Sequence, residues 1–211
     1  MQPVRNFTYS DSLRRALLAN VREFQDRRQS SDHLKLAAVA VTIFEHNSDA
    51  AVIVTKRSPR LKEHTGQWAM PGGRVDAGET VIEAALRELR EEVNLDLSED
   101  QVLGTLDDYV TRSGYVITPV VVWAGIDDQH LRPNPDEVAS IHPFTFQELK
   151  REDSPILTSI PESDRLVLSM NYFEDVIYAP TAAMLYQFRE VAIEGRETRV
   201  LDYDQPVFAW R

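Results

Sequence analysis

Three glutamates lie close together in the sequence with a spacing that suits metal chemistry. Glu88, Glu91 and Glu92 are spaced i, i+3 and i+4, so in a helix their carboxylates project from one face. Like charges at this spacing destabilise an exposed helix by roughly 0.2–0.5 kcal/mol per pair, and by more when they are buried. Clusters of oxygen ligands of this kind bind Mg²⁺ or Mn²⁺. A solvated acidic face is the alternative interpretation.

The residues around these glutamates form a longer pattern. The segment from Gly73 to Leu95 resembles the Nudix box, G-x5-E-x7-R-E-U-x-E-E-x-G-U, in which U is a bulky aliphatic residue. Asn94 stands where the family has glycine, but asparagine also tolerates the left-handed backbone that closes helices, so the departure is mild. The matching residues are Gly73, Glu79, Arg87, Glu88, Leu89, Glu91, Glu92 and Leu95.

This resemblance implies a fold and an activity. The Nudix fold is of the α/β class, with a mixed β-sheet sandwiched between α-helices, and we expect an added N-terminal helix and C-terminal helix here. We predict one Nudix hydrolase domain over residues 1–211, with a helical extension at 1–33, a core at 34–150 and a C-terminal extension at 151–211. The implied activity is metal-dependent hydrolysis of a nucleoside diphosphate linked to another moiety, with Mg²⁺ as cofactor and Mn²⁺ as its alternative.

The resemblance also implies a role for each matching residue. Glu88, Glu91 and Glu92 match the family's metal-binding glutamates, and the carbonyl of Gly73 is a further candidate ligand. Arg87 and Glu79 match the pair that orients these carboxylates, a supporting role that metal ligands commonly require. The implied catalytic set is Glu79, Arg87, Glu88, Glu91 and Glu92.

One glutamate must also accept a proton from the attacking water, and the sequence does not identify it. Glu137 is a candidate for this base or for an extra metal ligand, because it opens a predicted strand after the box. An ordinary surface carboxylate is the alternative interpretation of Glu137.

The residues immediately upstream narrow the substrate. They resemble the motif LLTxR[SA]x3Rx3Gx3FPGG, which marks coenzyme A pyrophosphatases within the Nudix superfamily. Three features depart from it: Ile53-Val54 replaces the two leucines, Lys62 an arginine, and Met70 a phenylalanine. The residues that match in register are Thr55, Arg57, Ser58, Gly66, Pro71, Gly72 and Gly73.

The charge of this upstream segment agrees with a ligand rich in phosphate. Positions 56 to 74 contain five basic residues and only one acidic residue, in a chain whose net charge is −11. This local reversal of sign suits the 3′-phosphate of coenzyme A, although some of these charges could simply solvate a loop. Lys62 keeps the charge of arginine but loses its bidentate geometry. The candidate substrate-binding residues are Arg57, Ser58, Arg60, Lys62, Gly72 and Arg74.

Composition excludes several other classes of protein. The net charge of −11 repels nucleic acid, and the absence of cysteine excludes disulfides, thiolate metal sites and a cysteine nucleophile. The longest apolar run, residues 115–126, is too short to span a bilayer, and residues 1–11 do not resemble a signal peptide. We therefore expect a cytoplasmic protein with a small-molecule nucleotide substrate and no membrane partner. Family resemblance alone also suggests a homodimer.

The elements that position these residues follow from periodicity. We predict a helix over residues 11–29, a hairpin of strands at 34–44 and 51–55, and a loop over 56–78. Thr80 and Glu83 fit a capping box, so a helix should run from Thr80 to Asn94.

The pattern after this helix favours strands and then helices. Strands are predicted at residues 101–111, 115–124, 137–144 and 176–178. A short helix is expected at 145–151, a loop at 152–171, and a helix from Pro180 to Val191.

Three functions compete on this basis. The first is hydrolysis of coenzyme A or its thioesters to 3′,5′-ADP and 4′-phosphopantetheine or its acyl derivative. The second is a Nudix enzyme for another substrate, such as ADP-ribose, a dinucleoside polyphosphate or an oxidised nucleotide. The third is a Nudix module that senses a nucleotide without turnover; loss of the glutamates would be expected for it, and here all of them are present.

Overall fold

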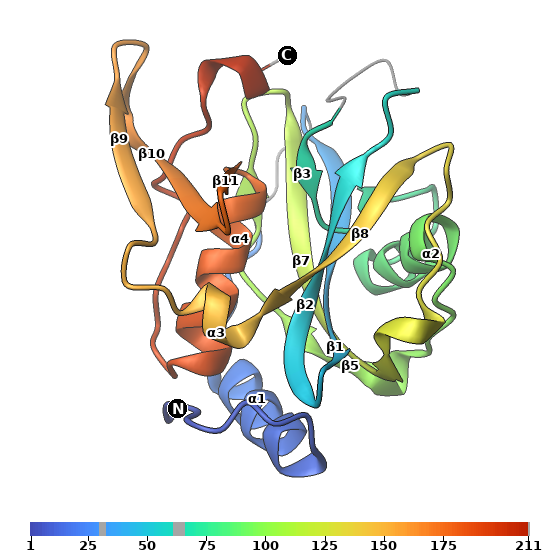
Figure 1. Ribbon diagram of the computed structural model, residues 1–211. Helices are drawn as coiled ribbons and strands as arrows, with labels where there is room; N and C mark the ends of the chain where they lie inside the picture. The colour runs from blue at the N-terminus through green and yellow to red at the C-terminus, as the bar shows by residue number, and fades with distance from the viewer. Residues whose placement is uncertain (30–32, 61–65, 211) are drawn as a thin grey trace.

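The computed structural model describes residues 1–29, 33–60 and 66–210, and its first element is helix α1 (Asp11–Glu23) (Figure 1). Ser10 caps this helix, because its hydroxyl accepts a hydrogen bond from the Leu13 amide. Leu13, Leu17 and Val21 are buried on one face, as their spacing predicts. The predicted extension of the helix to Gln29 is wrong, since the backbone becomes extended at Phe24.

A distant pair of aspartates explains this early end. The carboxylates of Asp107 and Asp108 accept hydrogen bonds from the backbone amides of Arg27 and Gln29, replacing the bonds that a longer helix would make. The same contact divides the strand predicted at residues 101–111. It becomes β5 (Val102–Thr105) and β6 (Tyr109–Val110), with the aspartates between them.

The central sheet has eight strands within the described residues. Besides β5 and β6 they are β1 (Lys35–His46), β2 (Asp49–Arg57), β3 (Trp68–Ala69), β4 (Gly72–Arg74), β7 (Tyr115–Asp127) and β8 (Val138–Thr145). The main path of the sheet runs β3-β2-β1-β7-β5. β1 and β7 are parallel, whereas every other pair is antiparallel. The predicted β1–β2 hairpin is confirmed, and Asn47 and Ser48 adopt positive φ in its turn. β3 and β4 lie in the segment predicted as loop.

Helix α2 (Val81–Val93) covers one face of this sheet (Figure 1). Both of its predicted ends are confirmed: Thr80 and Glu83 form the capping box, and Asn94 has a left-handed φ of 58°. Small side chains on the helix and on β1 allow close packing. The buried residues of this layer include Ala38, Ala40, Ala84, Ala85 and Leu89.

Helix α4 (Thr181–Phe188) packs on the opposite face and continues into a π-helical turn, Arg189–Ile193. The predicted helix is confirmed, with Pro180 as the capping residue rather than the first helical one. The larger apolar cluster includes Leu17 of α1, Val41 of β1 and Phe188 of α4, so it joins all three predicted segments of the chain.

A second sheet lies beyond α4, and it includes much of the range 152–171 that was predicted to be loop. That prediction is wrong, because β9 (Ile156–Ile160), β10 (Ser163–Tyr172) and β11 (Asp175–Tyr178) form an antiparallel sheet after the short helix α3 (Phe146–Leu149). β9 is exposed along nearly its whole length, so its sequence lacks the alternation of a half-buried strand. Three short 3₁₀ turns complete the described structure, Glu99–Gln101, Asp128–His130 and Val207–Ala209.

Within the described residues, no helix combines the length and apolarity that crossing a bilayer requires.

Candidate active site

Two glutamates of α2 meet a third from a loop that is distant in sequence. The carboxylate oxygens of Glu88, Glu92 and Glu137 lie within 4.8 Å of one another. Glu88 and Glu92 are only 8% and 5% exposed. Mg²⁺ and Mn²⁺ prefer oxygen ligands of this type, so this glutamate trio has the donor chemistry to hold a divalent cation.

Electrostatics favour a cation at this position. Burial, and then repulsion from the Glu88 carboxylate, raises the pKa of Glu92 to about 8 in the protein alone. Burial also raises the pKa of Glu88, although a hydrogen bond from Arg87 opposes this. A cation among the three carboxylates would offset both their dehydration and their mutual repulsion.

Gly73 of β4 lies directly against this trio. A Cβ atom built on Gly73 would stand 2.6 Å from Cδ of Glu88, so any side chain at position 73 would displace the Glu88 carboxylate. The backbone of β4 therefore approaches the carboxylate closely only because residue 73 is glycine. This contact places the Gly73 backbone beside the trio, where its predicted carbonyl ligand would have to lie.

Arg87 connects the trio to the preceding loop. Its Nη1 donates to Glu88 at 2.7 Å, and its Nε donates to Glu79 at 2.9 Å. Its Nη2 also donates to the carbonyl of Arg74, which ties α2 to β4. Glu91 accepts from Arg87 at 3.3 Å but is 45% exposed and is not part of the trio. Arg87 and Glu79 thus hold Glu88 in one orientation, the arrangement expected of residues that support a metal ligand.

Backbone contacts bring Glu137 to the trio. The Ser58 amide donates to the Glu137 carbonyl at 2.8 Å, and the Ser58 hydroxyl donates to the carbonyl of Pro135 at 3.0 Å. The Asn134 amide donates to the carbonyl of Glu92 at 2.8 Å, at the end of α2. Apart from a hydrogen bond that its hydroxyl accepts from the Arg60 amide, Ser58 contacts the loop that carries Glu137, and direct contact between Ser58 and a substrate stays a prediction.

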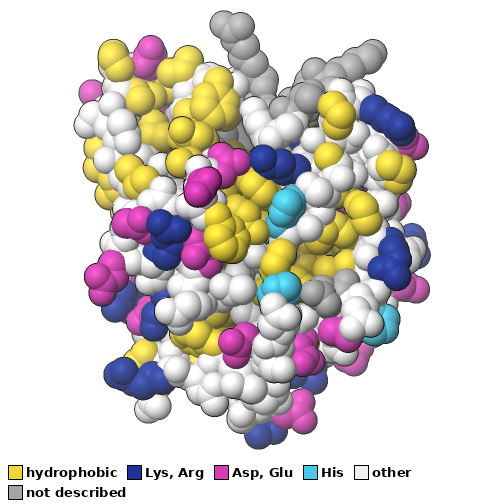
Figure 2. All heavy atoms as spheres, viewed as in Figure 1, with side chains coloured by type: hydrophobic (Ala, Val, Ile, Leu, Met, Phe, Trp, Pro, Cys, Tyr) yellow, Lys and Arg dark blue, Asp and Glu magenta, His cyan; other side chains and the backbone are white. Residues whose placement is uncertain are grey.

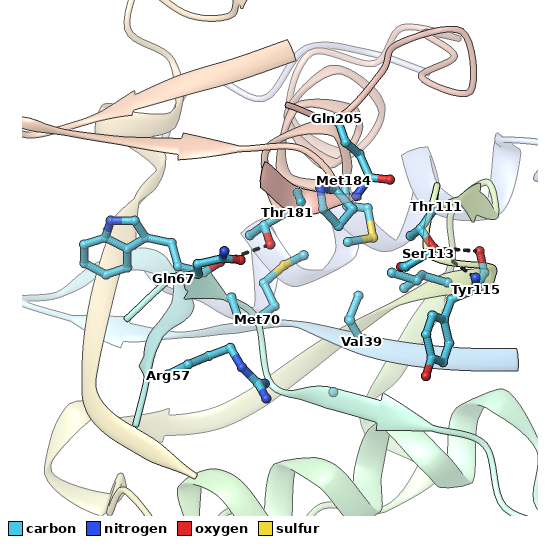
Figure 3. Close-up of a pocket in the computed structure, with 16 residues that line it drawn as sticks. Val39, Arg57, Gln67, Met70, Thr111, Ser113, Tyr115, Thr181, Met184 and Gln205 are labelled. Carbon is cyan, nitrogen blue, oxygen red and sulfur yellow. Dashed lines mark hydrogen bonds between the residues drawn. The ribbon is translucent and has the colours of Figure 1, made fainter. Parts of the chain in front are cut away.

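A pocket of about 210 Å³ lies between the central sheet and α4, on the side of the sheet away from α2 (Figure 3). The strands contribute one wall and the C-terminal extension the other. Arg57 is the one charged residue among the described residues that line this first pocket. The other lining residues include the apolar Val39, Met70 and Met184 and the polar but uncharged Thr111, Thr181 and Gln205.

Arg57 joins this pocket to the glutamate trio. Its positive charge acts on Glu92, and its side chain also lines the pocket, below Met70 in Figure 3. The Arg57 Nε is buried and has no hydrogen-bond partner within the part of the chain that the structure describes. A buried donor without a partner is costly, so Arg57 is suited to bind an anionic group that bridges the pocket and the trio.

The other predicted substrate-binding residues are dispersed. Arg60 is highly exposed and pairs with Asp136 at 2.6 Å, beside the Glu137 loop. Arg74 donates to the hydroxyl of Tyr115 at 2.9 Å, at the edge of the first pocket. Gly72 lines that pocket, whereas Lys62 lies outside the described residues.

Sequence reasoning missed the wall that the C-terminal extension provides. Thr181, Met184 and Gln205 all line the first pocket, although no motif marks them. The only available signal was the helix start at Pro180, which places the backbone but does not indicate which sheet face the helix covers.

Comparison with known proteins identifies the family. The NUDIX domain model matches residues 34–162. The chain belongs to the Nudix family. A Nudix hydrolase designated NudL from Escherichia coli O6:H1 is 39% identical over 196 residues, covering 90% of this chain and 96% of its own length. The NudL of Pectobacterium atrosepticum is 36% identical over 155 residues, covering 72% of this chain and 79% of its own.

Solved structures of Nudix proteins are also similar to this chain. A MutT/nudix family protein from Enterococcus faecalis aligns with a TM-score of 0.49 at 15% identity, covering 81% of this chain and 63% of its own. The MutT protein of Methanosarcina mazei Go1 aligns with a TM-score of 0.44 at 15% identity, covering 60% of this chain and 83% of its own. The mixed sheet between helices confirms the predicted fold class. Family membership makes the chain a Nudix pyrophosphohydrolase, an enzyme class that generally needs a divalent metal and acts on small nucleotide substrates.

Proposed function

We propose that this Nudix hydrolase cleaves the diphosphate bond of coenzyme A or its thioesters, releasing 3′,5′-ADP and 4′-phosphopantetheine or its acyl derivative. The observation that carries the proposal is the composition of the first pocket. Apart from Arg57, its described lining is apolar or neutral. Such a pocket suits an uncharged arm attached to a diphosphate, whereas a second phosphate-bearing nucleotide would require more cations.

The glutamates take the metal-binding role in this proposal. Glu88, Glu92 and Glu137 would hold Mg²⁺, or Mn²⁺ in its place, with Glu91 and the Gly73 carbonyl as the further ligands implied by the family resemblance. When bound, the ion neutralises diphosphate charge and lowers the pKa of a water molecule. Arg87 and Glu79 keep Glu88 in place through the hydrogen bonds described above.

The chain's own residues then position and activate the reactants. Arg57 donates to the diphosphate at the junction of pocket and trio. One carboxylate of the trio accepts a proton from the attacking water, whose oxygen forms the new bond to phosphorus while the other phosphate leaves. Arg60 and Lys62 are the cations proposed to bind the 3′-phosphate of the substrate, and Arg74 is proposed to contact the substrate separately, at the edge of the first pocket.

A substrate panel tests this function. The purified enzyme would be assayed with Mg²⁺ on coenzyme A, acetyl-coenzyme A, ADP-ribose, a dinucleoside tetraphosphate and 8-oxo-dGTP. We expect release of 3′,5′-ADP from the coenzyme A substrates to exceed the other rates. Preference for another member of the panel would overturn the substrate assignment and leave the Nudix chemistry in place.

A matched pair of variants sharpens this test. Arg57→Gln should lower turnover of coenzyme A by ten-fold or more, on the order of a lost charge-assisted hydrogen bond of about 1.5–3 kcal/mol. Arg22→Gln, an exposed site on α1, is the control and should keep the wild-type rate. Equal rates in the two variants would remove Arg57 from the diphosphate site.

The homodimer is also proposed from family resemblance. Light scattering after size exclusion should return twice the chain mass of 24.1 kDa, and a single species of 24.1 kDa would exclude the dimer.

A further inference from the structure

A second pocket adjoins the first on the side away from the glutamate trio. It also measures about 210 Å³, and it lies among β3, β11 and the C-terminal turn at 207–209. Both pockets share part of their lining, so they form neighbouring compartments along one wall. The shared residues are Gln67, Trp68, Pro180, Thr181 and Ala209.

The charge of the second pocket does not suit phosphate. Asp175 is the one charged residue among its described lining residues. The Asp175 carboxylate accepts hydrogen bonds from the Val176 amide, the Trp68 indole at 2.9 Å and Lys56 at 3.2 Å. These partners satisfy the carboxylate, and no Lys or Arg is among the described lining residues, so a neutral ligand is favoured over an anionic one.

Apolar side chains dominate the mouth of the second pocket. Tyr178 is 42% exposed and Phe208 is 55% exposed, and their rings meet edge to face at 5.3 Å. Figure 2 shows hydrophobic side chains gathered over the second sheet and the C-terminal turn. Exposed apolar area beside a substrate pocket is typical of a binding surface, because covering it with an apolar ligand is favourable.

The glutamate trio and the two pockets form successive sites for different parts of one substrate. Phosphate is favoured at Arg57 and the trio, a neutral arm in the first pocket, and an apolar group next to Tyr178 and Phe208. We propose that the second pocket is a subsite for the apolar acyl chain of a thioester substrate whose neutral arm lies in the adjoining first pocket. This inference rests on the proposed function, and it predicts that medium-chain thioesters bind better than free coenzyme A.

Binding of phosphate-free probes tests the subsite independently of catalysis. Calorimetry would compare S-acetyl-, S-hexanoyl- and S-decanoyl-pantetheine, which lack the diphosphate and cannot be hydrolysed at it. Each methylene that becomes buried should tighten binding by about two- to four-fold. We therefore expect the decanoyl probe to bind at least ten-fold more tightly than the acetyl probe.

Variants at the pocket mouth locate the effect. Phe208→Ser and Tyr178→Ser should each lose most of the gain with chain length and leave the acetyl probe unaffected. Leu157→Ser is the matched control, because Leu157 is also 42% exposed on the same sheet but lines neither pocket. The control should keep the wild-type dependence on chain length.

Two results would overturn the subsite: wild-type affinity that does not change with chain length, or an equal loss in Leu157→Ser. Hydrolysis of coenzyme A is measured separately and decides the proposed function. Chain-length dependence without any such hydrolysis would support the apolar site and refute the substrate assignment, so the two failures are distinguishable.

Discussion

Replacing Glu92 by glutamine should stabilise the protein in the absence of metal. Glu92 is 5% exposed, and its pKa is raised from 4.5 to about 8 by burial and by the nearby Glu88. An acid whose pKa rises on folding loses stability as the pH increases from its unfolded value to its folded value, here from about 4.5 to about 8. At pH 7 the folded protein holds a proton that the unfolded chain has released.

The size of this effect follows from the two pKa values. At 1.36 kcal/mol per pKa unit, the penalty at pH 7 has an upper limit of about 3 kcal/mol. Glutamine keeps the shape and removes the charge, so Glu92→Gln should recover much of this amount. Mg²⁺ should reverse the ranking, because a bound ion stabilises the wild type by mass action and the variant has lost a ligand.

Urea unfolding in EDTA and then in saturating Mg²⁺ measures both terms. Glu197→Gln serves as the control, since Glu197 is exposed and should change the free energy of unfolding by less than about 0.5 kcal/mol. A Glu92→Gln protein that is less stable than wild type in EDTA would refute the picture of a dehydrated, mutually repelling cluster. Equal stabilisation of both proteins by Mg²⁺ would remove Glu92 from the set of ligands.

Three further predictions concern the residues around this cluster and one distant ion pair. Arg87→Lys should lower activity or Mg²⁺ affinity by roughly 10–100-fold, because lysine cannot hold Glu88 and its other partners together. Metal titration and turnover measurements check this, and an unchanged Mg²⁺ affinity would argue against it. Gly73→Ala should weaken Mg²⁺ binding and lower the unfolding midpoint, since its Cβ would overlap the Glu88 carboxylate, and wild-type values for both would contradict the close contact. Burial alone would raise the pKa of Asp204, but hydrogen bonds from Arg112 and Ser163 lower it to about 2. The stabilisation is therefore present above about pH 4 and lost as the pH falls to about 2. Because Ser163 and the Gln205 amide share in it and Arg112 is partly exposed, Arg112→Met should lower the free energy of unfolding in urea by at most about 2 kcal/mol at pH 7, and by much less at about pH 2.5.

Local features of the sequence were the predictable part of this molecule. The spacing of Glu88 and Glu92 and the capping box at Thr80 act within one helix, so the sequence alone indicates them. The approach of Glu137 depends on contacts of Ser58 and Asn134 with distant backbone, which no local pattern encodes. Its role in binding a metal stays a prediction, as do the roles of the other site residues.

The predictions from sequence failed where contacts between residues distant along the chain override local conformational preference. Residues 24–29 continue a helical pattern, yet Asp107 and Asp108 take their backbone amides. The second sheet was missed because β9 is exposed and presents no apolar face. The wall formed by Thr181, Met184 and Gln205 depends on how the C-terminal extension folds back, which is a property of the whole chain.

The central sheet stands between helix α2 and the wall that the C-terminal extension gives to the two pockets. α2 and its glutamates cover one face, whereas α4 and the C-terminal turn shape both pockets on the other. Part of the lining of both pockets comes from residues beyond the NUDIX match at 34–162. Exchange of the C-terminal extension should therefore alter which molecules the pockets select, while the glutamates proposed to bind the metal stay in place.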